Sequence, residues 1–463
     1  MSEGLLKYDN IFFKPKKHEV LSLKKINIGI VGYGVVGSNV VKILDKDREI
    51  ITQKSGLDIN VKKVYTRNWN RKLLYPIDDS KKAKTVDEII NDKDVDIVVE
   101  VAGGIEFPYQ VITQAIKNRK NIVTANKALL AEKGKDIFSL AQKYDVRIGF
   151  EAAVAGGIPI IKALREGLVA NDISKIYGIL NGTTNYILTS MYTEGKSFEQ
   201  ALKEAQEKGY AEADPTLDIN GTDAAHKISI LASLSFGGFV DFSQVYVEGI
   251  DKIDTLDIEL GRELGYTLKL LAIAKSHGEE VEIRVNPTFL PSWHPLSKVD
   301  GVFNAVMVEG NNVGETMFYG RGAGGLPTAS AVISDIVCIG KSIANNLGRD
   351  LEITSMDWKH KDLTLTKVKD FYTRYYVRFT VPDITGILAK IASVFAKYNI
   401  SIASVIQKEK VLKLQKETKE KVVPLVILTH TASENNIQLA IKEIVSNKYS
   451  VENPVIIRVE DEE

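Results

Sequence analysis

The chain has 463 residues, with 60 Lys plus Arg against 60 Asp plus Glu, so its formal net charge is zero. This balance argues against a general affinity for nucleic acid and provides no polybasic anchor for a membrane surface. No run of about 20 apolar residues is present, so we expect no membrane span. The single cysteine, Cys338, excludes an internal disulfide and favours a reducing compartment, which predicts a cytoplasmic protein.

The first part of the chain alternates between strand and helix patterns. Residues 1–25 carry acids among their lysines and no apolar central segment, so we interpret them as an arm and not as a signal peptide. We then expect strands at 26–31, 59–65, 96–101, 121–124 and 146–150, with amphipathic helices at 36–52, 108–117 and 127–143. Strands that are apolar on both faces predict a parallel sheet covered by helices, in an α/β domain over residues 26–150.

The pattern changes after residue 151. Helical segments dominate 159–236, and two strand-like runs between 302 and 319 flank a predicted hairpin at 311–314. We therefore expect an α+β second domain over residues 151–322. A helix at 327–345 follows a glycine-rich turn and is expected to pack back on the first domain, so that residues 323–347 complete it. The mostly polar residues 348–370 are predicted to form a linker.

A third unit is expected over residues 371–463. Its order is strand (375–381), helix (386–398), strand (401–407), strand (422–429), helix (435–446) and strand (451–459). This βαββαβ order predicts a ferredoxin-like module. Residues 408–421, rich in Lys and Glu, are predicted to be a solvated loop between its middle strands.

The sequence GYGVVG at residues 32–37 directly follows the first strand and opens a helix. In such a turn Gly32 permits the tight bend, Gly34 lets the backbone approach a pyrophosphate, and Gly37 allows close packing of helix and strand. The N–H groups at the helix start, which includes Val35 and Val36, favour phosphate binding. Because strand, turn and helix agree, we interpret residues 26–150 as a Rossmann-type dinucleotide-binding domain.

The end of the second strand bears on the choice of nucleotide. A site for NAD usually has an acid there to bind the ribose hydroxyls, but this strand is followed by Thr66, Arg67 and Asn68. Arg67 could pair with a 2′-phosphate, which favours NADP. A solvated arginine and use of NAD remain the alternatives.

Residues 209–227 concentrate acidic side chains around one lysine. Glu212, Asp214 and Asp218 lie on a predicted loop, and Asp223 and Lys227 lie four residues apart on one face of the following helix. Such an i,i+4 pair is usually a surface salt bridge. The three preceding carboxylates favour instead a site that holds an α-ammonium group beside a proton-transferring lysine.

Two neighbouring features have ordinary structural explanations. The cluster at 178–185, with small hydroxyl and amide side chains, suits a polar ligand, but a turn with a helix cap explains it as well. His226 points away from Lys227 around the helix, so we interpret it as a packing or capping residue and not as a catalyst.

From the GYGVVG turn onward, the chain resembles homoserine dehydrogenase over nearly its full length. The resemblance rests on five stretches in order, at residues 124–127 (TANK), 151–159 (EAAVAGGIP), 179–185, 209–227 and 322–328 (GAGGLPT). The C-terminal unit resembles an ACT domain through residues 381–386 (VPDITG) and 399–402 (NISI).

This resemblance implies the NAD(P)H-dependent interconversion of L-aspartate 4-semialdehyde and L-homoserine, a step toward threonine, methionine and isoleucine. It implies Lys227 as the acid/base with Asp223 orienting it, and substrate binding by Glu212, Asp218 and Asp223. Lys127 would lie between cofactor and substrate, and Gly324 would contact the cofactor. The resemblance also implies a sodium site formed by the Glu151 carboxylate and the carbonyls of Val154, Gly156 and Ile158.

The resemblance further implies a homodimer or homotetramer and feedback control through the ACT domain, with L-threonine as the expected effector. The alternative for that domain is a dimerising or stabilising role without a ligand. Val35 replaces a threonine frequent in the family, and Thr385 replaces a proline frequent in ACT domains. Because only about 25 residues precede the first strand, we expect the monofunctional form. Another amino-acid dehydrogenase and a ligand sensor with a degenerate core are the competing interpretations.

Overall fold

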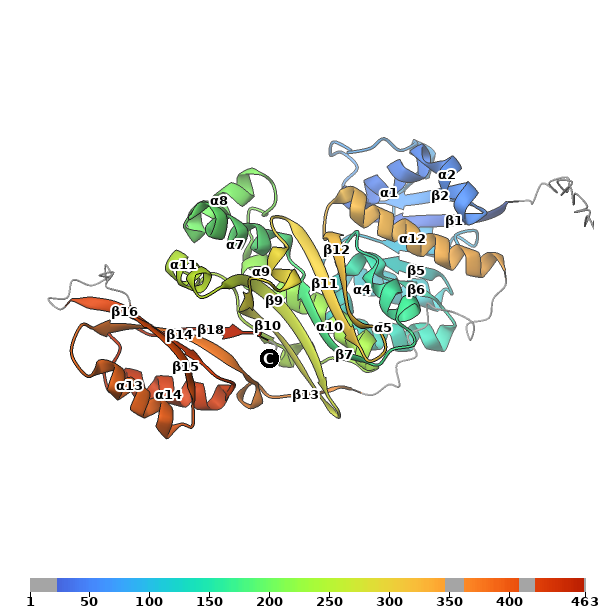
Figure 1. Ribbon diagram of the computed structural model, residues 1–463. Helices are drawn as coiled ribbons and strands as arrows, with labels where there is room; N and C mark the ends of the chain where they lie inside the picture. Colours follow the sequence, from blue (N-terminus) through green and yellow to red (C-terminus); the bar gives the residue numbers. More distant parts are fainter. Residues whose placement is uncertain (1–22, 346–361, 408–420, 462–463) are drawn as a thin grey trace, which may run out of the picture.

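The computed structural model describes residues 23–345, 362–407 and 421–461. Most of the predicted arm, residues 346–361 of the predicted linker and residues 408–420 of the predicted loop lie outside the described residues. Figure 1 shows the N-terminal α/β unit in blue and cyan at one end. A green and yellow unit follows in the middle, and an orange and red unit lies at the other end.

The first unit is built on a six-stranded parallel sheet. Its order is β3-β2-β1-β4-β5-β6, with strands β1 (Lys24–Val31), β2 (Leu57–Tyr65), β3 (Lys82–Ala83), β4 (Ile97–Glu100), β5 (Asn121–Thr124) and β6 (Ile148–Gly149). This is the strand order of the Rossmann fold, and the predicted parallel sheet is confirmed. The direction of winding reverses between β1 and β4, which opens a crevice at the carboxyl ends of these two strands.

Helices cover both faces of this sheet. One face is covered by α1 (Val35–Lys46) and α12 (Gly325–Ala344), and the other by α4 (Glu106–Lys117) and α5 (Lys127–Tyr144). The predicted return of the late helix onto the first sheet is therefore observed. Among the described residues, α12 is the one helix long and apolar enough to cross a membrane. Half of its apolar 18-residue stretch is buried inside the fold.

The prediction of a single helix at 36–52 is wrong. The chain forms α1 and then α2 (Arg48–Ser55), because Asp47 leaves the helical conformation at φ −108° and ψ 19°. Asp47 caps the first helix through its own N–H, which donates to the Ile43 carbonyl at 2.8 Å. The second helix has no buried residue, so no apolar face holds it in line with the first.

The middle unit is a mixed sheet with helices on one side. Its strands are β7 (Ile173–Ile179), β9 (Tyr266–His277), β10 (Glu280–Pro291), β11 (Phe303–Gly310) and β12 (Gly314–Arg321). Its main helices are α7 (Gly182–Glu194), α8 (Phe198–Glu207), α10 (Thr222–Phe236) and α11 (Thr255–Glu263), with the short α9 (Thr216–Ile219). The hairpin predicted at 311–314 joins β11 to β12. The long β9–β10 hairpin was not predicted, because strands buried on both faces show no alternation.

The C-terminal unit has the predicted βαββαβ order. Its elements are β14 (Tyr372–Pro382), α13 (Ile387–Lys397), β15 (Ile402–Gln407), β16 (Val422–Thr429), α14 (Glu434–Ser446) and β18 (Val455–Val459), with the short β17 (Ala432–Ser433). The strand order β18-β14-β16-β15 and two helices on one face make it ferredoxin-like.

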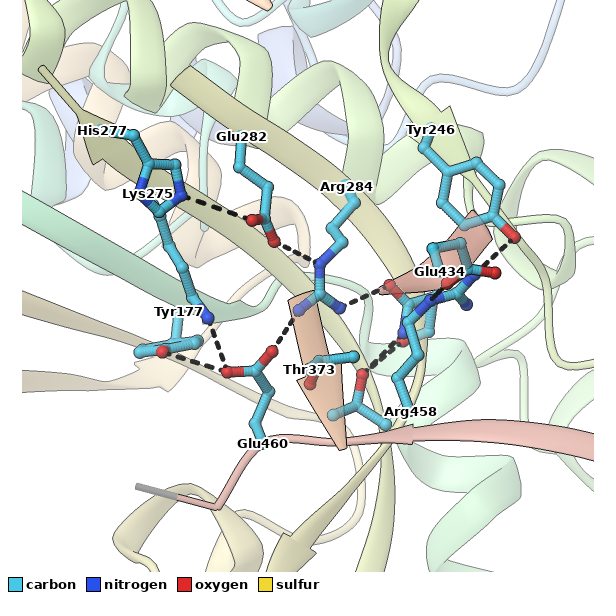
Figure 2. A network of polar contacts seen from close by, with 12 residues as sticks. Tyr177, Tyr246, Lys275, His277, Glu282, Arg284, Thr373, Glu434, Arg458 and Glu460 are labelled. Atoms are coloured by element: carbon cyan, nitrogen blue, oxygen red, sulfur yellow. Dashed lines mark hydrogen bonds and ion pairs between the residues drawn. The ribbon is translucent and has the colours of Figure 1, made fainter. Parts of the chain in front are cut away.

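The C-terminal sheet continues the middle sheet. Strand β18 pairs in parallel with β10, at Arg458 opposite Thr288, and Glu460 N–H donates to the Phe289 carbonyl at 3.0 Å. Figure 2 shows the buried polar network at this seam, where the Arg284 guanidinium lies between Glu282 and Glu460. The two units therefore form one continuous sheet instead of two bodies joined only by a linker.

A second buried ion pair reinforces the seam. Asp257 on α11 is fully buried and accepts two hydrogen bonds from Arg378 of β14, at 2.6 and 2.8 Å, and one from Tyr376 at 2.9 Å. Part of the predicted linker is also ordered on this sheet, since β13 (Thr364–Leu365) pairs with β10.

Candidate functional site

The glycine turn lies at the crevice of the first sheet. Gly32 has φ +108° and donates its N–H to the Tyr65 carbonyl at 2.9 Å, which ties the turn to β2. A Cβ on Gly37 would lie 2.1 Å from the Gly32 carbonyl oxygen, so helix and turn pack too closely for any side chain. A Cβ on Gly34 would meet nothing within 4 Å. The helix start is therefore open above Gly34, and a dinucleotide phosphate fits there.

The opposite wall of the crevice is held by a buried carboxylate at the end of β4. Glu100 is fully buried and accepts hydrogen bonds from Ala102 N–H and from the Thr124 hydroxyl, each at 2.8 Å. Asn126 caps α5 and donates its side-chain amide to the Gly104 carbonyl at 2.6 Å. These bonds fix residues 101–104 relative to Lys127, the first residue of α5.

The predicted nucleotide residues lie around the outer part of this crevice. Arg67 follows β2, is exposed, and lies with its guanidinium carbon 5.5 Å from the centre of the Phe107 ring. Gly324, at φ +118°, precedes α12. The next glycine, Gly325, is so close to α1 that a Cβ there would lie 2.8 Å from a methyl carbon of Val35. The late glycine turn therefore adjoins the GYGVVG turn.

A cavity of about 650 Å³ continues from this crevice into the middle unit. It is lined from the first unit by residues that include Val36, Gly103, Gly104, Asn126 and Lys127, and from the middle unit by Glu212, Asp214, Asp218, Asp223 and His226. Residues at least 85 positions apart in the sequence thus face the same space. The structure brings together the predicted Lys127, Glu212, Asp218 and Asp223.

Asp223 joins two lysines beneath this cavity. Its Oδ2 accepts from Lys227 Nζ at 2.7 Å, and its Oδ1 pairs with Lys127 Nζ at 2.8 Å. Lys227 also donates to the Leu180 carbonyl at 2.6 Å. The side chains of Lys227 and Asp223 are 9% and 7% exposed, so the i,i+4 pair is not a surface salt bridge, whereas the Lys127 side chain is 41% exposed.

The two lysines differ in pKa because their surroundings differ. Burial lowers the pKa of Lys227, and Asp223 offsets this only in part. For Lys127, burial is outweighed by the attraction of Asp223, with Asp218 and Glu212 adding to it, so its pKa is raised. Burial acts against ionisation of Asp223, but Lys227 and Lys127 together lower its pKa. Lys227 is therefore the lysine that loses its proton more readily.

Two other residues of the acidic segment have structural roles. Asp214 accepts hydrogen bonds from the N–H and hydroxyl of Thr216, at 3.1 and 2.5 Å, and so shapes the loop. His226 stacks on Phe242 with ring centres 4.4 Å apart, as expected for a packing residue, although it also lines the cavity. Burial lowers the pKa of His226 to about 4, so its ring is neutral at pH 7.

The residues of the expected sodium site lie behind the late glycine turn. Glu151 is buried, and its carboxylate accepts the N–H groups of Ile161 and Lys162 at 2.9 and 3.0 Å. A Cβ on Gly156 would lie 2.5 Å from the Gly322 carbonyl oxygen, which places this loop against residues 321–324. Within the described ranges, no group of three or more His, Cys, Asp or Glu side chains could hold a metal ion.

Sequence reasoning missed Glu100 as part of the site, and it noted Asn181 only within the cluster 178–185, for which a polar ligand and a helix cap were both open. Asn181 donates to Asp218 at 2.7 Å and to Asp223 at 2.9 Å. Its helix-capping sequence was visible, but only the fold shows which carboxylates the amide reaches. Glu100 ends an apolar strand, and a lone acid at the carboxyl end of a parallel strand was the available signal.

The glycine turn, the crevice and the lysine–carboxylate cluster define a nicotinamide-dependent oxidoreductase with a C-terminal regulatory-type domain. Comparison with known families agrees: homoserine dehydrogenase matches residues 159–337, the NAD-binding domain of homoserine dehydrogenase matches 32–151, and the ACT domain matches 375–447. The chain belongs to the homoserine dehydrogenase family, whose activity is the NAD(P)H-dependent interconversion of L-aspartate 4-semialdehyde and L-homoserine.

Individual relatives match over nearly the whole chain. A homoserine dehydrogenase of Neisseria gonorrhoeae is 44% identical, and the alignment covers 95% of this chain and 99% of that protein. One of Helicobacter pylori is 43% identical, with 95% of this chain and 100% of that protein covered. The crystal structure of a homoserine dehydrogenase from Thiobacillus denitrificans has a TM-score of 0.87 at 40% identity, covering 95% of this chain and 99% of that one. A hyperthermophilic archaeal homoserine dehydrogenase in complex with NADPH has a TM-score of 0.56 at 29% identity, and the match covers 69% of this chain and 98% of that one.

Proposed function

We propose that Lys227 is the acid/base of the reaction and that Asp223 orients it. The observation that carries this proposal is the Lys227–Asp223–Lys127 cluster, in which Lys227 and Asp223 are buried while Asp223 and Lys127 line a cavity shared with the dinucleotide crevice. Glu212 and Asp218 line the same cavity and would bind the substrate α-ammonium group. The experiment is steady-state oxidation of L-homoserine by wild type and Lys227→Met, and undiminished turnover of the variant would refute the assignment.

The chemistry follows from the charges in this cavity. The bound cofactor supplies hydride to the aldehyde carbon or accepts it from homoserine. In the reductive direction charge develops on the substrate oxygen, and a charged Lys227 donates a proton to it. In the oxidative direction a neutral Lys227 removes the hydroxyl proton. Lys127, whose pKa is raised, stays charged and stabilises the developing oxyanion.

We propose NADP as the preferred cofactor, with NAD as the alternative, held at Gly32, Gly34, Val35, Val36, Gly37, Arg67, Lys127 and Gly324. The exposed Arg67 after β2, with no acid beside it, supports a site for a 2′-phosphate. Arg67→Ala should raise the Michaelis constant for NADP and leave that for NAD nearly unchanged. Equal changes for both nucleotides would refute a phosphate-binding role.

We propose that Glu151 and the carbonyls of Val154, Gly156 and Ile158 bind sodium. All four are oxygen donors, as a hard cation requires, and the buried Val154 and Gly156 carbonyls accept no hydrogen bond from another described residue. Burial and the neighbouring charge of Asp335 raise the pKa of Glu151 to about 7, and a bound cation would lower it. Sodium should therefore raise the melting temperature at pH 8 more than choline does at equal ionic strength. Equal melting temperatures would contradict the site.

We propose that the ACT domain provides feedback control, with L-threonine as the expected effector. Support comes from a chain of contacts across the seam. Arg458 of β18 donates to Glu248 at 2.9 Å, and two residues later Ile250 N–H donates to the Ile219 carbonyl at 2.9 Å, next to Asp218. A shift of β18 would therefore reach the substrate loop.

This regulation should be tested in the full-length chain. Removing the ACT domain would take Arg378 and Tyr376 from the buried Asp257 and Glu460 from the buried Arg284, so a truncated protein is a poor control. Glu248→Gln removes the charge that pairs with Arg458 and should weaken inhibition by threonine. An unchanged inhibition constant would refute this route, and the absence of any threonine effect on wild type would refute the effector.

We propose that the chain forms a homodimer or homotetramer. The exposed Met317 and Tyr319 on β12 give that strand an apolar surface suited to a subunit contact. Sedimentation equilibrium would test this, and a monomer at micromolar concentration would contradict it.

We also propose that the protein is a cytoplasmic enzyme of threonine, methionine and isoleucine biosynthesis. Auxotrophy for homoserine after gene deletion is the expected phenotype.

We propose the division into a cofactor domain (26–150, completed by 323–347), a substrate and dimerisation domain (151–322) and an ACT domain (371–463). The packing of α12 with α1 supports assigning it to the cofactor domain. Limited proteolysis should leave residues 151–322 intact in its first cuts, and first cuts inside this range would contradict these limits.

A further inference from the structure

Asn181 follows β7 and lies between the two acidic groups of the substrate site. It is 5% exposed, and its side-chain nitrogen lies 2.7 Å from Asp218 Oδ1 and 2.9 Å from Asp223 Oδ2. The preceding residue, Leu180, accepts the hydrogen bond from Lys227. The turn after β7 thus contacts both the lysine and the two carboxylates.

The orientation of the Asn181 amide is fixed by the helix that it caps. Its Oδ1 accepts the N–H of Thr184 at 2.8 Å, and an N–H group can only donate. The NH2 end must therefore face the carboxylates, and each of its two hydrogens has one acceptor. The cap of α7 and the contact with the two acids are separate functions of opposite ends of one side chain.

The two acids share a donor because they lie close together, with Asp223 buried and Asp218 half-buried. Burial raises the pKa of Asp218, and the neighbouring charge of Asp223 raises it further. The hydrogen bond from Asn181 is the largest effect that lowers it, and Thr183 and the charge of Lys227 add to this. Asp223 has both lysines as partners, and Asn181 joins Asp218 to it by donating to both carboxylates.

We infer that Asn181 is a positioning residue that holds Asp218 ionised beside Asp223, so that Asp218 can bind the substrate ammonium group. This inference rests on the proposed substrate role of Asp218. Loss of the amide would let Asp218 take up a proton at a higher pH than in wild type. The substrate site would then lose a negative charge and bind homoserine more weakly.

Two substitutions separate this role from helix capping. Asn181→Ser keeps a good N-cap oxygen but has no amide to reach the carboxylates. Asn181→Asp also keeps the cap but places a third carboxylate against the other two. Ser197→Ala removes the cap of α8, away from the cavity, and controls for a general loss of helix stability.

The test is the pH dependence of kcat/KM for homoserine oxidation in these variants. For Asn181→Ser we expect a roughly 10- to 100-fold fall, mainly in KM, and an acid limb moved up by about one pH unit or more, as for loss of one hydrogen bond to a charged group. Asn181→Asp should move the acid limb of the kcat/KM profile to a still higher pH, and Ser197→Ala should leave this limb at its wild-type pH. Binding of NADPH, followed by its fluorescence, should not change.

Activity of Asn181→Ser within twofold of wild type would overturn the inference. A fall in kcat/KM with an unmoved acid limb would also overturn it, because lost packing alone predicts that result. Failure of the proposed catalytic roles would show differently, as undiminished turnover of Lys227→Met, a variant that leaves Asn181 and both carboxylates in place.

Discussion

Replacing Lys227 by methionine removes one ammonium group from the site and little else. The lost contacts are those to Asp223 at 2.7 Å and to the Leu180 carbonyl at 2.6 Å. Methionine keeps an unbranched chain of similar length, and Asp223 keeps Lys127 and Asn181 as partners. Removing one member of a buried pair costs up to about 3–5 kcal/mol, and the remaining partners should hold the loss below that range. We therefore expect a folded variant.

The expected effect on catalysis is large. A positioned acid/base contributes about 10²- to 10⁴-fold to a reaction rate, so kcat for homoserine oxidation should fall by roughly that factor. The affinity for NADPH should stay near that of wild type, because Lys227 contacts Asp223 and Leu180 of the middle unit, whereas the cofactor is proposed to bind at the glycine turn of the first unit. Stopped-flow formation of NADPH and fluorescence titration measure these two quantities separately.

Lys127→Met provides the matched comparison. Lys127 lowers the pKa of Lys227, so its removal should raise that pKa and move the basic limb of homoserine oxidation to higher pH. Lys227→Met should abolish this limb. The opposite result would be a larger loss of turnover in Lys127→Met than in Lys227→Met, with the basic limb of the pH profile absent from Lys127→Met. The roles of the two lysines would then be reversed, and the reasoning from burial would be refuted.

Other changes test separate parts of the molecule. Glu212→Gln should raise the Michaelis constant for homoserine with little change in kcat, and initial rates would show whether it does. Arg378→Met leaves the fully buried Asp257 without its charge partner and should lower the free energy of unfolding by roughly 3–5 kcal/mol in urea titrations. Gly37→Ala should abolish NADPH binding, because its Cβ would lie 2.1 Å from a backbone oxygen of the turn. Burial raises the pKa of Glu151 from 4.5 to about 7, so without sodium the folded chain holds a proton that the unfolded chain has lost. The free energy of unfolding should therefore fall as pH rises from about 4.5 to 7. If the free energy of unfolding of Glu151→Gln falls equally with pH, Glu151 is not the cause.

The fold was predictable where local patterns determine it. The parallel sheet followed from apolar strands alternating with helices, and the C-terminal unit followed from its βαββαβ order. The pairing of β10 with β18 was not predictable, since it joins residues about 170 positions apart and no local periodicity encodes it. The β9–β10 hairpin left one missed signal, the glycine at position 278 with φ +80° between two apolar runs.

The site was predictable in composition but not in geometry. The spacing of Asp223 and Lys227 placed them on one helical face, yet the contact between Asp223 and Lys127 depends on how α5 and α10 pack. Burial of the pair, which lowers the pKa of Lys227 below that of a free lysine, likewise depends on the surrounding domain. The amide of Asn181 reaches its two carboxylates only once three separate segments have folded together.

The most direct measurement is the initial rate of NADPH formation from L-homoserine and NADP by the wild-type chain as a function of pH. A buried Lys227 acting as base predicts a homoserine-dependent rate that rises with pH, with its midpoint below 10.5, the ordinary lysine value. A rate that does not depend on homoserine, or a midpoint at or above that value, would contradict the proposed mechanism.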